Sequence, residues 1–178
     1  MTDFSYLNVD NAYKLINQKV TKTPLVTNDY INNLLEAEIY FKLENLQNTG
    51  SFKLRGATHK ITKLIENVKD SGVVAYSSGN HAQAVAYASM INSISAKIIM
   101  PKTAPQIKIE NTKNYGAEVI LYDTYFQSRE EIGIEIQKKD NRALIKPYDD
   151  EDIIAGQGTA AIEIVNDLKE QSIEPDLY

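Results

Sequence analysis

Cysteine is absent from this chain of 178 residues, so disulfides and thiolate metal sites are excluded. Histidine is scarce, and His59 and His81 stand too far apart to predict a metal motif. No metal site is therefore expected. No apolar run reaches the length that crosses a bilayer, and the N-terminal residues lack the basic-then-apolar pattern of a secretory signal. These absences predict a cytoplasmic protein without a membrane partner.

The chain also lacks an excess of positive charge. Lysine and arginine together number 19 against 24 acidic residues, which gives a net charge of −5 with both signs interspersed. A nucleic-acid-binding surface needs a basic face, so no nucleic-acid partner is expected. Hydrophobic residues make up 43% and charged residues 24%, which is typical of a globular protein. The length suffices for one ordinary domain or two small ones.

Short apolar segments alternate with helical patterns from residue 73 onward. Strands are predicted at residues 73–76, 96–100, 118–122 and 142–146. Helices are predicted at residues 81–91, at about 105–116 and at about 127–138. Alternation of this kind with short connections is typical of a parallel sheet with right-handed crossovers. The predicted fold class is therefore α/β.

The flanking segments follow a different pattern. A strand is predicted at residues 39–43, and an amphipathic helix follows and ends near Val68. One more helix near the C-terminus is predicted from an apolar face, and residues 175–178 resemble the start of a further strand. The residues of that apolar face are Ala161, Ile164, Val165 and Leu168. We expect residues 72–148 to form a small parallel domain, inserted between residues 1–71 and 149–178 of a larger, incomplete domain.

Lys53 is the first candidate for chemistry. It stands between Phe52 and Leu54 at the predicted start of a helix, and Gly50 and Gly56 would allow a flat ligand to approach closely. Apolar surroundings disfavour a charged amine, so such a lysine can act as a nucleophile. A single lysine at this position would more often be an ordinary surface residue. Its combination with a second segment favours the chemical role.

That second segment is the turn Ser77-Ser78-Gly79-Asn80, which joins a predicted strand to a predicted helix. Exposed N–H groups at a helix N-terminus attract anions, and parallel sheets bind ligands at the carboxyl ends of their strands. The two hydroxyls and the Asn80 amide could hold a carboxylate or a phenolic oxygen. The alternative is a structural helix cap, because serine, glycine and asparagine all favour such turns. His81 alone would more often be structural than catalytic.

Three segments resemble one enzyme family. They are Gly50-Ser51-Phe52-Lys53-Leu54-Arg55-Gly56-Ala57, Ser77-Ser78-Gly79-Asn80-His81-Ala82-Gln83-Ala84 and Ala155-Gly156-Gln157-Gly158-Thr159. Together they resemble the pyridoxal-phosphate-dependent serine/threonine dehydratases and serine racemases. These enzymes form the fold-type II group, which is related to the tryptophan synthase β subunit. The likeness extends in order along essentially the whole chain.

The resemblance implies a role for each site residue. Lys53 would be the Schiff-base lysine of pyridoxal 5'-phosphate and the base that takes the Cα proton on one face. Phe52 would pack near the cofactor ring, and Asn80 would bond its phenolic oxygen. Ser77, Asn80 and His81 would line the site of the substrate carboxylate. β-Elimination from L-serine or L-threonine would then give a 2-oxo acid and ammonia.

Two positions bear on the subfamily. Ser78 stands where serine racemases carry the acid/base group opposite the lysine, whereas many threonine dehydratases have alanine. Arg129 matches an arginine near the substrate carboxylate in serine-racemase-like members, although it could equally be an exposed helix arginine paired with Glu130. The resemblance thus implies a serine/threonine dehydratase of serine-racemase-like type. A serine racemase and a β-hydroxyaspartate dehydratase remain alternatives.

The family's glycine-rich phosphate loop has no counterpart among the eight glycines of this sequence. The resemblance places that loop, the partner of the pyridine nitrogen and later cation ligands beyond Tyr178. We therefore expect a chain truncated relative to the family. It could be a homodimeric enzyme, a non-catalytic fragment or one half of a split protein that needs a complementing C-terminal chain.

Overall fold

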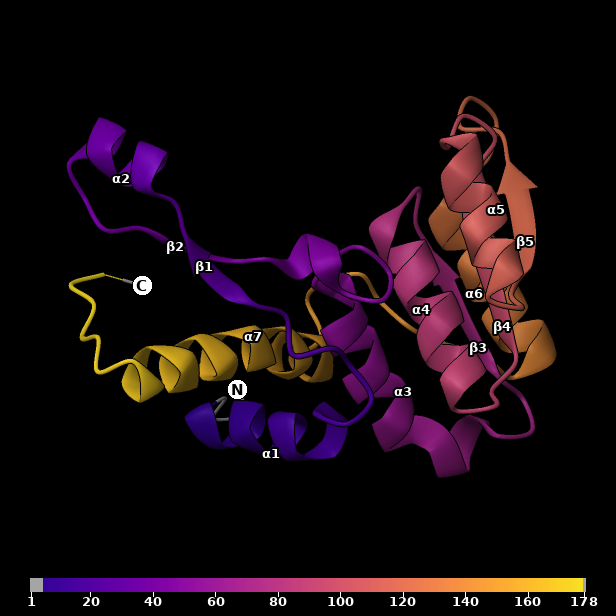
Figure 1. The fold of residues 1–178 in the computed structure, drawn as a ribbon. Helices are drawn as coiled ribbons and strands as arrows, with labels where there is room; N and C mark the ends of the chain where they lie inside the picture. Colours follow the sequence, from indigo (N-terminus) through magenta and orange to yellow (C-terminus); the bar gives the residue numbers. More distant parts are fainter. Residues whose placement is uncertain (1–4, 178) are drawn as a thin grey trace.

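The structure is a computed structural model, and it describes residues 5–177 (Figure 1). The N-terminal part holds α1 (Tyr6–Ile16), β1 (Leu25–Thr27), α2 (Asp29–Leu35), β2 (Tyr40–Lys42), the 3₁₀ helix η1 (Glu44–Leu46) and α3 (Lys53–Val68). The central part holds β3 (Val73–Tyr76), α4 (Asn80–Ile91), β4 (Ala96–Pro101), α5 (Gln106–Asn114), β5 (Glu118–Tyr122), α6 (Arg129–Asp140) and β6 (Ala143–Leu144). Helix α7 (Glu151–Glu170) follows.

The four strands of the central part form one parallel sheet in the order β5-β4-β3-β6. Val73 pairs with Ala96 on one side and with Ala143 on the other, so β3 is an inner strand. The first three residues of β3 are buried, which suits a parallel strand covered on both faces. The predicted α/β class and parallel sheet are confirmed.

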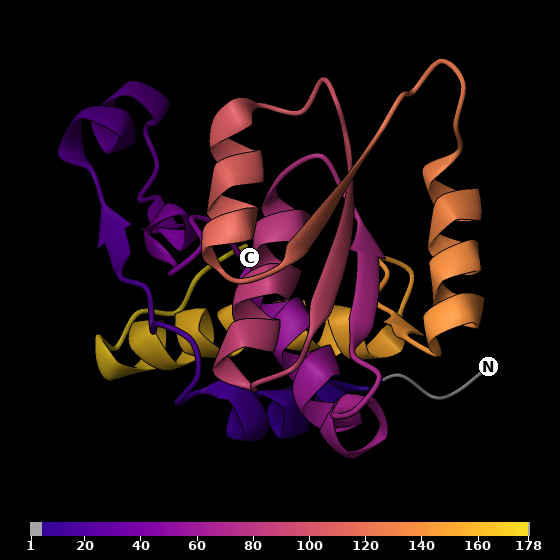
Figure 2. The ribbon, with the colours of Figure 1, turned by 90° about the vertical axis from the view of Figure 1, so that its right-hand side faces the viewer.

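Helices cover both faces of this sheet. Alanines of α4 pack with Val73 and Ala75 on one face, whereas Ile132 and Ile136 of α6 pack with Val74 on the other. Figure 2 shows α6 on one side of the strands and α4 and α5 on the opposite side. Helix α4 is buried around most of its circumference, as its alanine-rich sequence predicted.

A second group of helices lies beside the sheet and its covering helices. Helix α3 packs against α4 and α7, and α1 runs along α7 (Figure 1). The backbones of α3 and α7 touch where Gly56 meets Gly156, because a Cβ at Gly156 would stand 2.6 Å from the Gly56 Cα. Only glycine permits this approach. The prediction that Gly56 makes room for a flat ligand is therefore wrong, since α7 fills that space.

Strands β1 and β2 form a short antiparallel pair, and α2 sits at its end, away from the rest of the molecule in Figure 1. Helix α2 has no buried residue, and Tyr30 and Leu34 are largely exposed. The sequence analysis predicted neither α1, β1 nor α2. Strand β1 is three residues long and α2 seven, so neither carries enough periodic positions to reveal a buried face.

The predicted face of the last helix is only partly correct, since Leu168 is buried and Ile164 and Val165 are half-buried. The buried residues of α7 include Ile153, Thr159, Ile162 and Glu163, whereas Ala161 is exposed. The prediction treated only apolar residues as buried and ignored an acidic residue. Glu163 has charged partners in the interior and therefore faces inward. The buried face of the helix is thus turned relative to the predicted one.

The boundaries of other helices and strands differ slightly from the predicted ones. Strand β6 comprises two residues rather than the predicted 142–146, and α6 begins at Arg129 because the Ser128 side chain accepts a hydrogen bond from Glu131 N–H. Residues 173–177 form neither helix nor strand, and Tyr178 lies outside the described residues. The proposed division into residues 1–71, 72–148 and 149–178 stays a prediction. None of the helices within residues 5–177 is long and apolar enough to cross a membrane.

Candidate active site

Lys53 is the first residue of α3, as the sequence predicted. The preceding turn closes with a hydrogen bond from Gly50 N–H to the Gln47 carbonyl, and Gly50 has a left-handed φ of 72°. Buried residues from Leu54 onward then fix the helix. The Lys53 side chain is half-buried, and its Nζ donates to the Pro147 carbonyl at 2.9 Å.

The amine of Lys53 differs in its partners from two other half-buried lysines, Lys42 and Lys60. Lys42 Nζ lies 2.8 Å from Glu163, and Lys60 Nζ lies 3.0 Å from Asp150. Within residues 5–177, Lys53 has no carboxylate partner, and its one hydrogen bond goes to a neutral carbonyl. Phe52 is 44% exposed, and its ring centroid lies 5.2 Å from Nζ. The amine is thus held in place without being neutralised by an acid.

The Ser77–Asn80 turn lies at the carboxyl end of β3 and opens α4. The Ser77 N–H donates to the Ile99 carbonyl at 3.0 Å, and its hydroxyl accepts from Gly79 N–H at 3.2 Å. Ser78 and Asn80 are exposed. The Asn80 Oδ1 accepts a hydrogen bond from Lys108 Nζ at 2.8 Å. The amide NH₂ of Asn80 is therefore left to donate elsewhere.

His81 is buried, with 2% of its surface exposed. Its Nε2 lies 3.1 Å from the Ile145 carbonyl, two residues before the carbonyl that holds Lys53. Burial disfavours the charged ring and lowers the pKa of His81 to about 4, and the charge of Lys53 acts in the same direction. The backbone N–H of His81 lies in the first turn of α4.

Arg129 opens α6 and points its guanidinium at the Tyr76 ring, 5.3 Å from the centroid. Its Nε also donates to Glu130 at 2.7 Å, and that hydrogen bond raises the pKa of Arg129. The suggested pairing with Glu130 is therefore present. Tyr76 directly precedes Ser77, so the stacking also brings Arg129 to the end of β3.

The structure thus gathers the predicted residues at one edge of the sheet in two groups. Lys53 and His81 meet at the segment that follows β6, whereas Arg129 meets the end of β3. Within residues 5–177, no hydrogen bond joins Lys53 to Ser78 or Asn80. The structure does not test the prediction that Lys53 and Ser78 act on opposite faces of one bound ligand.

A buried charge network lies beside Lys53 and was not predicted from the sequence. Arg55 is fully buried and donates to Glu44 at 2.7 Å and to Glu163 at 2.8 Å. Arg55 lies in the segment Gly50–Ala57 that carries the resemblance, and Glu44 precedes that segment by six residues. Spacing alone could not pair them with Glu163, which lies on α7. The network ties the start of α3 to η1 and to α7.

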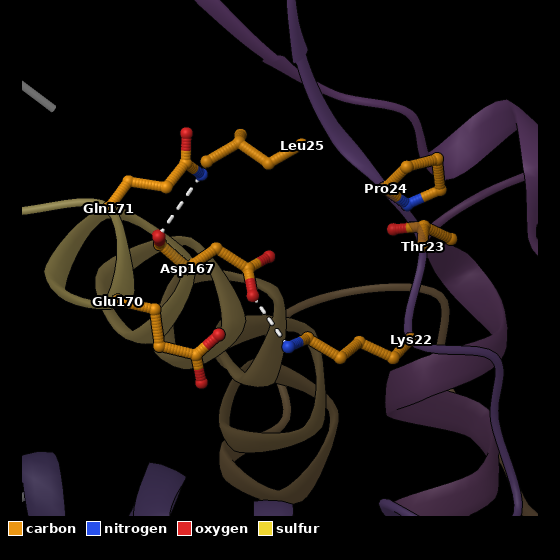
Figure 3. Close-up of a pocket in the computed structure, with 7 residues that line it drawn as sticks. All are labelled: Lys22, Thr23, Pro24, Leu25, Asp167, Glu170 and Gln171. Carbon is orange, nitrogen blue, oxygen red and sulfur yellow. Dashed lines mark hydrogen bonds and ion pairs between the residues drawn. The ribbon is translucent and has the colours of Figure 1, made fainter.

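A separate hollow of about 300 Å³ lies between the start of β1 and the end of α7 (Figure 3). Lys22 and Asp167 form an ion pair of 2.6 Å at its wall. It contains none of the predicted site residues. No group of three or more His, Asp or Glu residues within residues 5–177 could hold a metal ion.

Comparison with known proteins decides the family. A model of the family described as "Pyridoxal-phosphate dependent enzyme" matches residues 16–177. The chain belongs to the pyridoxal-phosphate dependent enzyme family. Its predicted resemblance is thereby confirmed.

Several named members of this family are similar to this chain over most of its length. L-threo-3-hydroxyaspartate ammonia-lyase of Saccharomyces cerevisiae is 44% identical over 164 residues, which are 92% of this chain and 50% of that protein. Serine racemase of Schizosaccharomyces pombe is 43% identical over 92% of this chain and 51% of its own. The crystal structure of serine racemase from Dictyostelium discoideum superposes with a TM-score of 0.85 at 40% identity, covering 90% of this chain and 52% of its own. This chain spans about half the length of these relatives.

The residues around Lys53 fit part of the family's cofactor. The hydroxyls of Thr49 and Ser51 and the Nδ1 of His81 are buried and have no hydrogen-bond partner within residues 5–177. Ser51 lies two residues before Lys53, and His81 contacts the segment that holds the Lys53 amine, so these atoms are polar groups available around the start of α3. Such a set suits a flat, polar, anionic ligand with a carbonyl group. Pyridoxal phosphate has this chemistry, and the fit concerns its ring and carbonyl rather than its phosphate.

Proposed function

We propose that this chain carries the lysine-bearing part of a pyridoxal-phosphate-dependent serine/threonine dehydratase of serine-racemase-like type. The observation that supports the proposal best is the amine of Lys53. It is half-buried at the carboxyl edge of a parallel sheet, and it is held by a carbonyl rather than by an acid. The half-buried Lys42 and Lys60 meet carboxylates, whereas Lys19 donates to the neutral side chains of Thr62 and Asn92. Lys53 remains free to act as a nucleophile and a base.

The bound cofactor would supply an electron-withdrawing ring that takes up the electron pair left by the Cα proton. Lys53 would hold the cofactor and accept that proton. Phe52 would cover one side of the ring, and the Asn80 NH₂ would donate to its phenolic oxygen. Loss of the β-hydroxyl of L-serine or L-threonine would then lead to a 2-oxo acid and ammonia.

The substrate carboxylate would lie at the start of α4. Ser77 and the backbone N–H groups of Asn80 and His81 lie where a helix N-terminus favours an anion. Arg129 would add a positive charge beside them, because its stacking on Tyr76 brings the guanidinium to the same end of β3. Small amino acids with one carboxylate match this arrangement.

Ser78 supports a second candidate function. Its side chain is exposed next to the helix start, where a hydroxyl can deliver a proton to a bound ligand. A group on the face opposite Lys53 is what racemisation needs in addition to elimination. Serine racemase is therefore the first alternative. A β-hydroxyaspartate dehydratase is the second, since one of the similar proteins is named as a hydroxyaspartate ammonia-lyase.

The test begins with cofactor binding. Purified protein is titrated with pyridoxal phosphate, and the visible absorbance of the lysine-bound cofactor is followed. We expect a band that Lys53→Ala abolishes and Lys102→Ala preserves, because Lys102 is an exposed lysine. L-Serine, L-threonine and β-hydroxyaspartate are then compared by 2-oxo acid release. D-Serine formation from L-serine separates racemisation from elimination.

The absence of a lysine-dependent band in folded protein would contradict this proposal. That result would favour a non-catalytic fragment or a split-protein half. Mixing with a complementing C-terminal chain would then separate these two. Homodimer formation and a cytoplasmic location stay predictions, and sedimentation and cell fractionation test them directly.

A further inference from the structure

The segment 145–147 carries two carbonyls that are held by two different side chains. Nε2 of His81 lies 3.1 Å from the Ile145 carbonyl, and Nζ of Lys53 donates to the Pro147 carbonyl at 2.9 Å. Ile145 also donates its own N–H to the Val74 carbonyl at 2.8 Å. The segment is therefore fixed to the sheet through Val74 and to α4 through His81. Lys53 is attached to the same short stretch of backbone.

The contact with Ile145 defines the state of the His81 ring. A carbonyl oxygen can only accept, so Nε2 must carry the proton. The ring is neutral at neutral pH, since burial opposes its charge. Nδ1 then has a lone pair and no partner within residues 5–177. His81 is thus a fixed donor at this place.

We infer that His81 is a positioning residue for Lys53, acting through the backbone of residues 145–147. Its N–H holds the Ile145 carbonyl, and this fixes the course of the chain to Pro147. The Pro147 carbonyl then stands where it can accept from the Lys53 amine. The inference deepens the proposed function, on which it rests for the assumption that Lys53 is the reactive group. It gives the buried imidazole a role other than contact with substrate.

The other histidine supplies a matched control. His59 is also buried, and its Nδ1 lies 2.6 Å from the carbonyl of Asp152. That carbonyl belongs to the first turn of α7 and receives no lysine hydrogen bond within residues 5–177. Removing the His81 imidazole takes one hydrogen bond from the Ile145 carbonyl, and removing the His59 imidazole takes one from the Asp152 carbonyl. Only the loss at His81 affects the backbone that holds Lys53.

The test measures the reactivity of the Lys53 amine without cofactor. Trace acetic anhydride labels each lysine of the full chain at a series of pH values, and mass spectrometry reads the peptide that contains Lys53. In His81→Leu, we expect labelling of Lys53 at neutral pH to rise about tenfold to 100-fold, as for the loss of one hydrogen bond to a charged group. His81→Gln can place an N–H near the position of Nε2 and should restore slow labelling. His59→Leu should leave Lys53 unchanged.

Unchanged Lys53 labelling in folded His81→Leu would overturn the inference, and so would an equal rise in His59→Leu. If His81→Leu does not fold, an NMR measurement on the wild-type protein still tests the inference. Two-bond ¹H–¹⁵N spectra report which ring nitrogen of His81 carries the proton, and a proton on Nδ1 would contradict the inference. None of these measurements uses pyridoxal phosphate. A missing cofactor band would therefore contradict the proposed function, whereas the labelling of Lys53 would still test the inference about His81.

Discussion

At the scale of single residues, both histidines are buried and both contact backbone carbonyls. Burial lowers the pKa of each ring, and for His81 to about 4. An ordinary histidine in the unfolded chain titrates near 6.5. Between these two pH values the unfolded chain takes up a proton that the folded protein does not bind. Stability is therefore complete above about pH 6.5 and falls as the pH is lowered toward 4.

We predict that the free energy of unfolding falls by up to about 3 kcal/mol between pH 6.5 and 4 through His81. Urea denaturation at a series of pH values measures this change. His81→Gln has no titrating ring and should flatten the curve, whereas the smaller contribution of His59 should persist. Curves of equal slope for the wild type and His81→Gln would show that the ring does not titrate as described.

Ser78 allows a second prediction at this scale. Its proposed role as the proton donor opposite Lys53 concerns racemisation and not elimination. In cofactor-loaded protein, Ser78→Ala should lower D-serine formation by at least about 100-fold, the usual size of a general acid–base contribution. Release of 2-oxo acid should fall by less than about tenfold. Chiral chromatography and a 2-oxo acid assay on one sample give both rates, and an equal fall in both would contradict the role.

At the scale of elements, the crossing of α3 and α7 depends on two glycines. A Cβ at Gly156 would meet Gly56 Cα at 2.6 Å and the Arg55 carbonyl at 2.8 Å, and neither backbone atom can move aside alone. A Cβ at Gly158 would meet a methyl carbon of the Val9 side chain at 2.9 Å. A side chain can rotate away. The same substitution on the same helix should therefore have different effects.

We predict that Gly156→Ala destabilises the protein by about 1–3 kcal/mol or more, as is usual for overpacking. Gly158→Ala should be nearly neutral, because alanine favours a helix by about 1 kcal/mol over glycine and offsets the local crowding. Thermal and urea unfolding of both variants provide the comparison. Equal stabilities for the two variants would mean that the helices separate easily at the Gly56 contact.

At the scale of the whole molecule, Arg55 joins parts of the chain that are distant in sequence. Its guanidinium donates to Glu44 on η1 and to Glu163 on α7, and the backbone carbonyl of Thr21 lies 3.4 Å away. Removing Arg55 leaves Glu44 without an ion-pair partner within residues 5–177, whereas Glu163 keeps Lys42 at 2.8 Å. The two segments that Arg55 joins to α3 would then separate more easily.

Arg55→Met should therefore lower the free energy of unfolding by about 3–5 kcal/mol. Arg129→Met offers a matched control, because Arg129 is partly exposed and its partner is the neighbouring Glu130. We expect that variant to stay within about 0.5 kcal/mol of the wild type. Denaturant titrations of both proteins measure the difference. A small loss of unfolding free energy in Arg55→Met would contradict this prediction and indicate that water reaches the network.

Local patterns predicted much of this fold and of its site. Strand Val73–Tyr76 and the helix that ends at Val68 were placed correctly, because a short apolar run and helical spacing are read within a few residues. Lys53 was placed at the start of a helix for the same reason. The buried face of the last helix was predicted only in part, since Leu168 is buried as expected but the burial of Glu163 depends on Arg55, which lies 108 positions away.

The sequence by itself determined the α/β alternation, the parallel sheet and the types of residue available for chemistry, because these depend on spacing along the chain. Only the tertiary structure decided which groups meet. It joined Lys53 to a carbonyl 94 positions away, buried the imidazole of His81 and closed α3 upon α7 at Gly56. Contacts of this kind depend on how whole elements pack, and no local pattern encodes the partner of a buried polar atom.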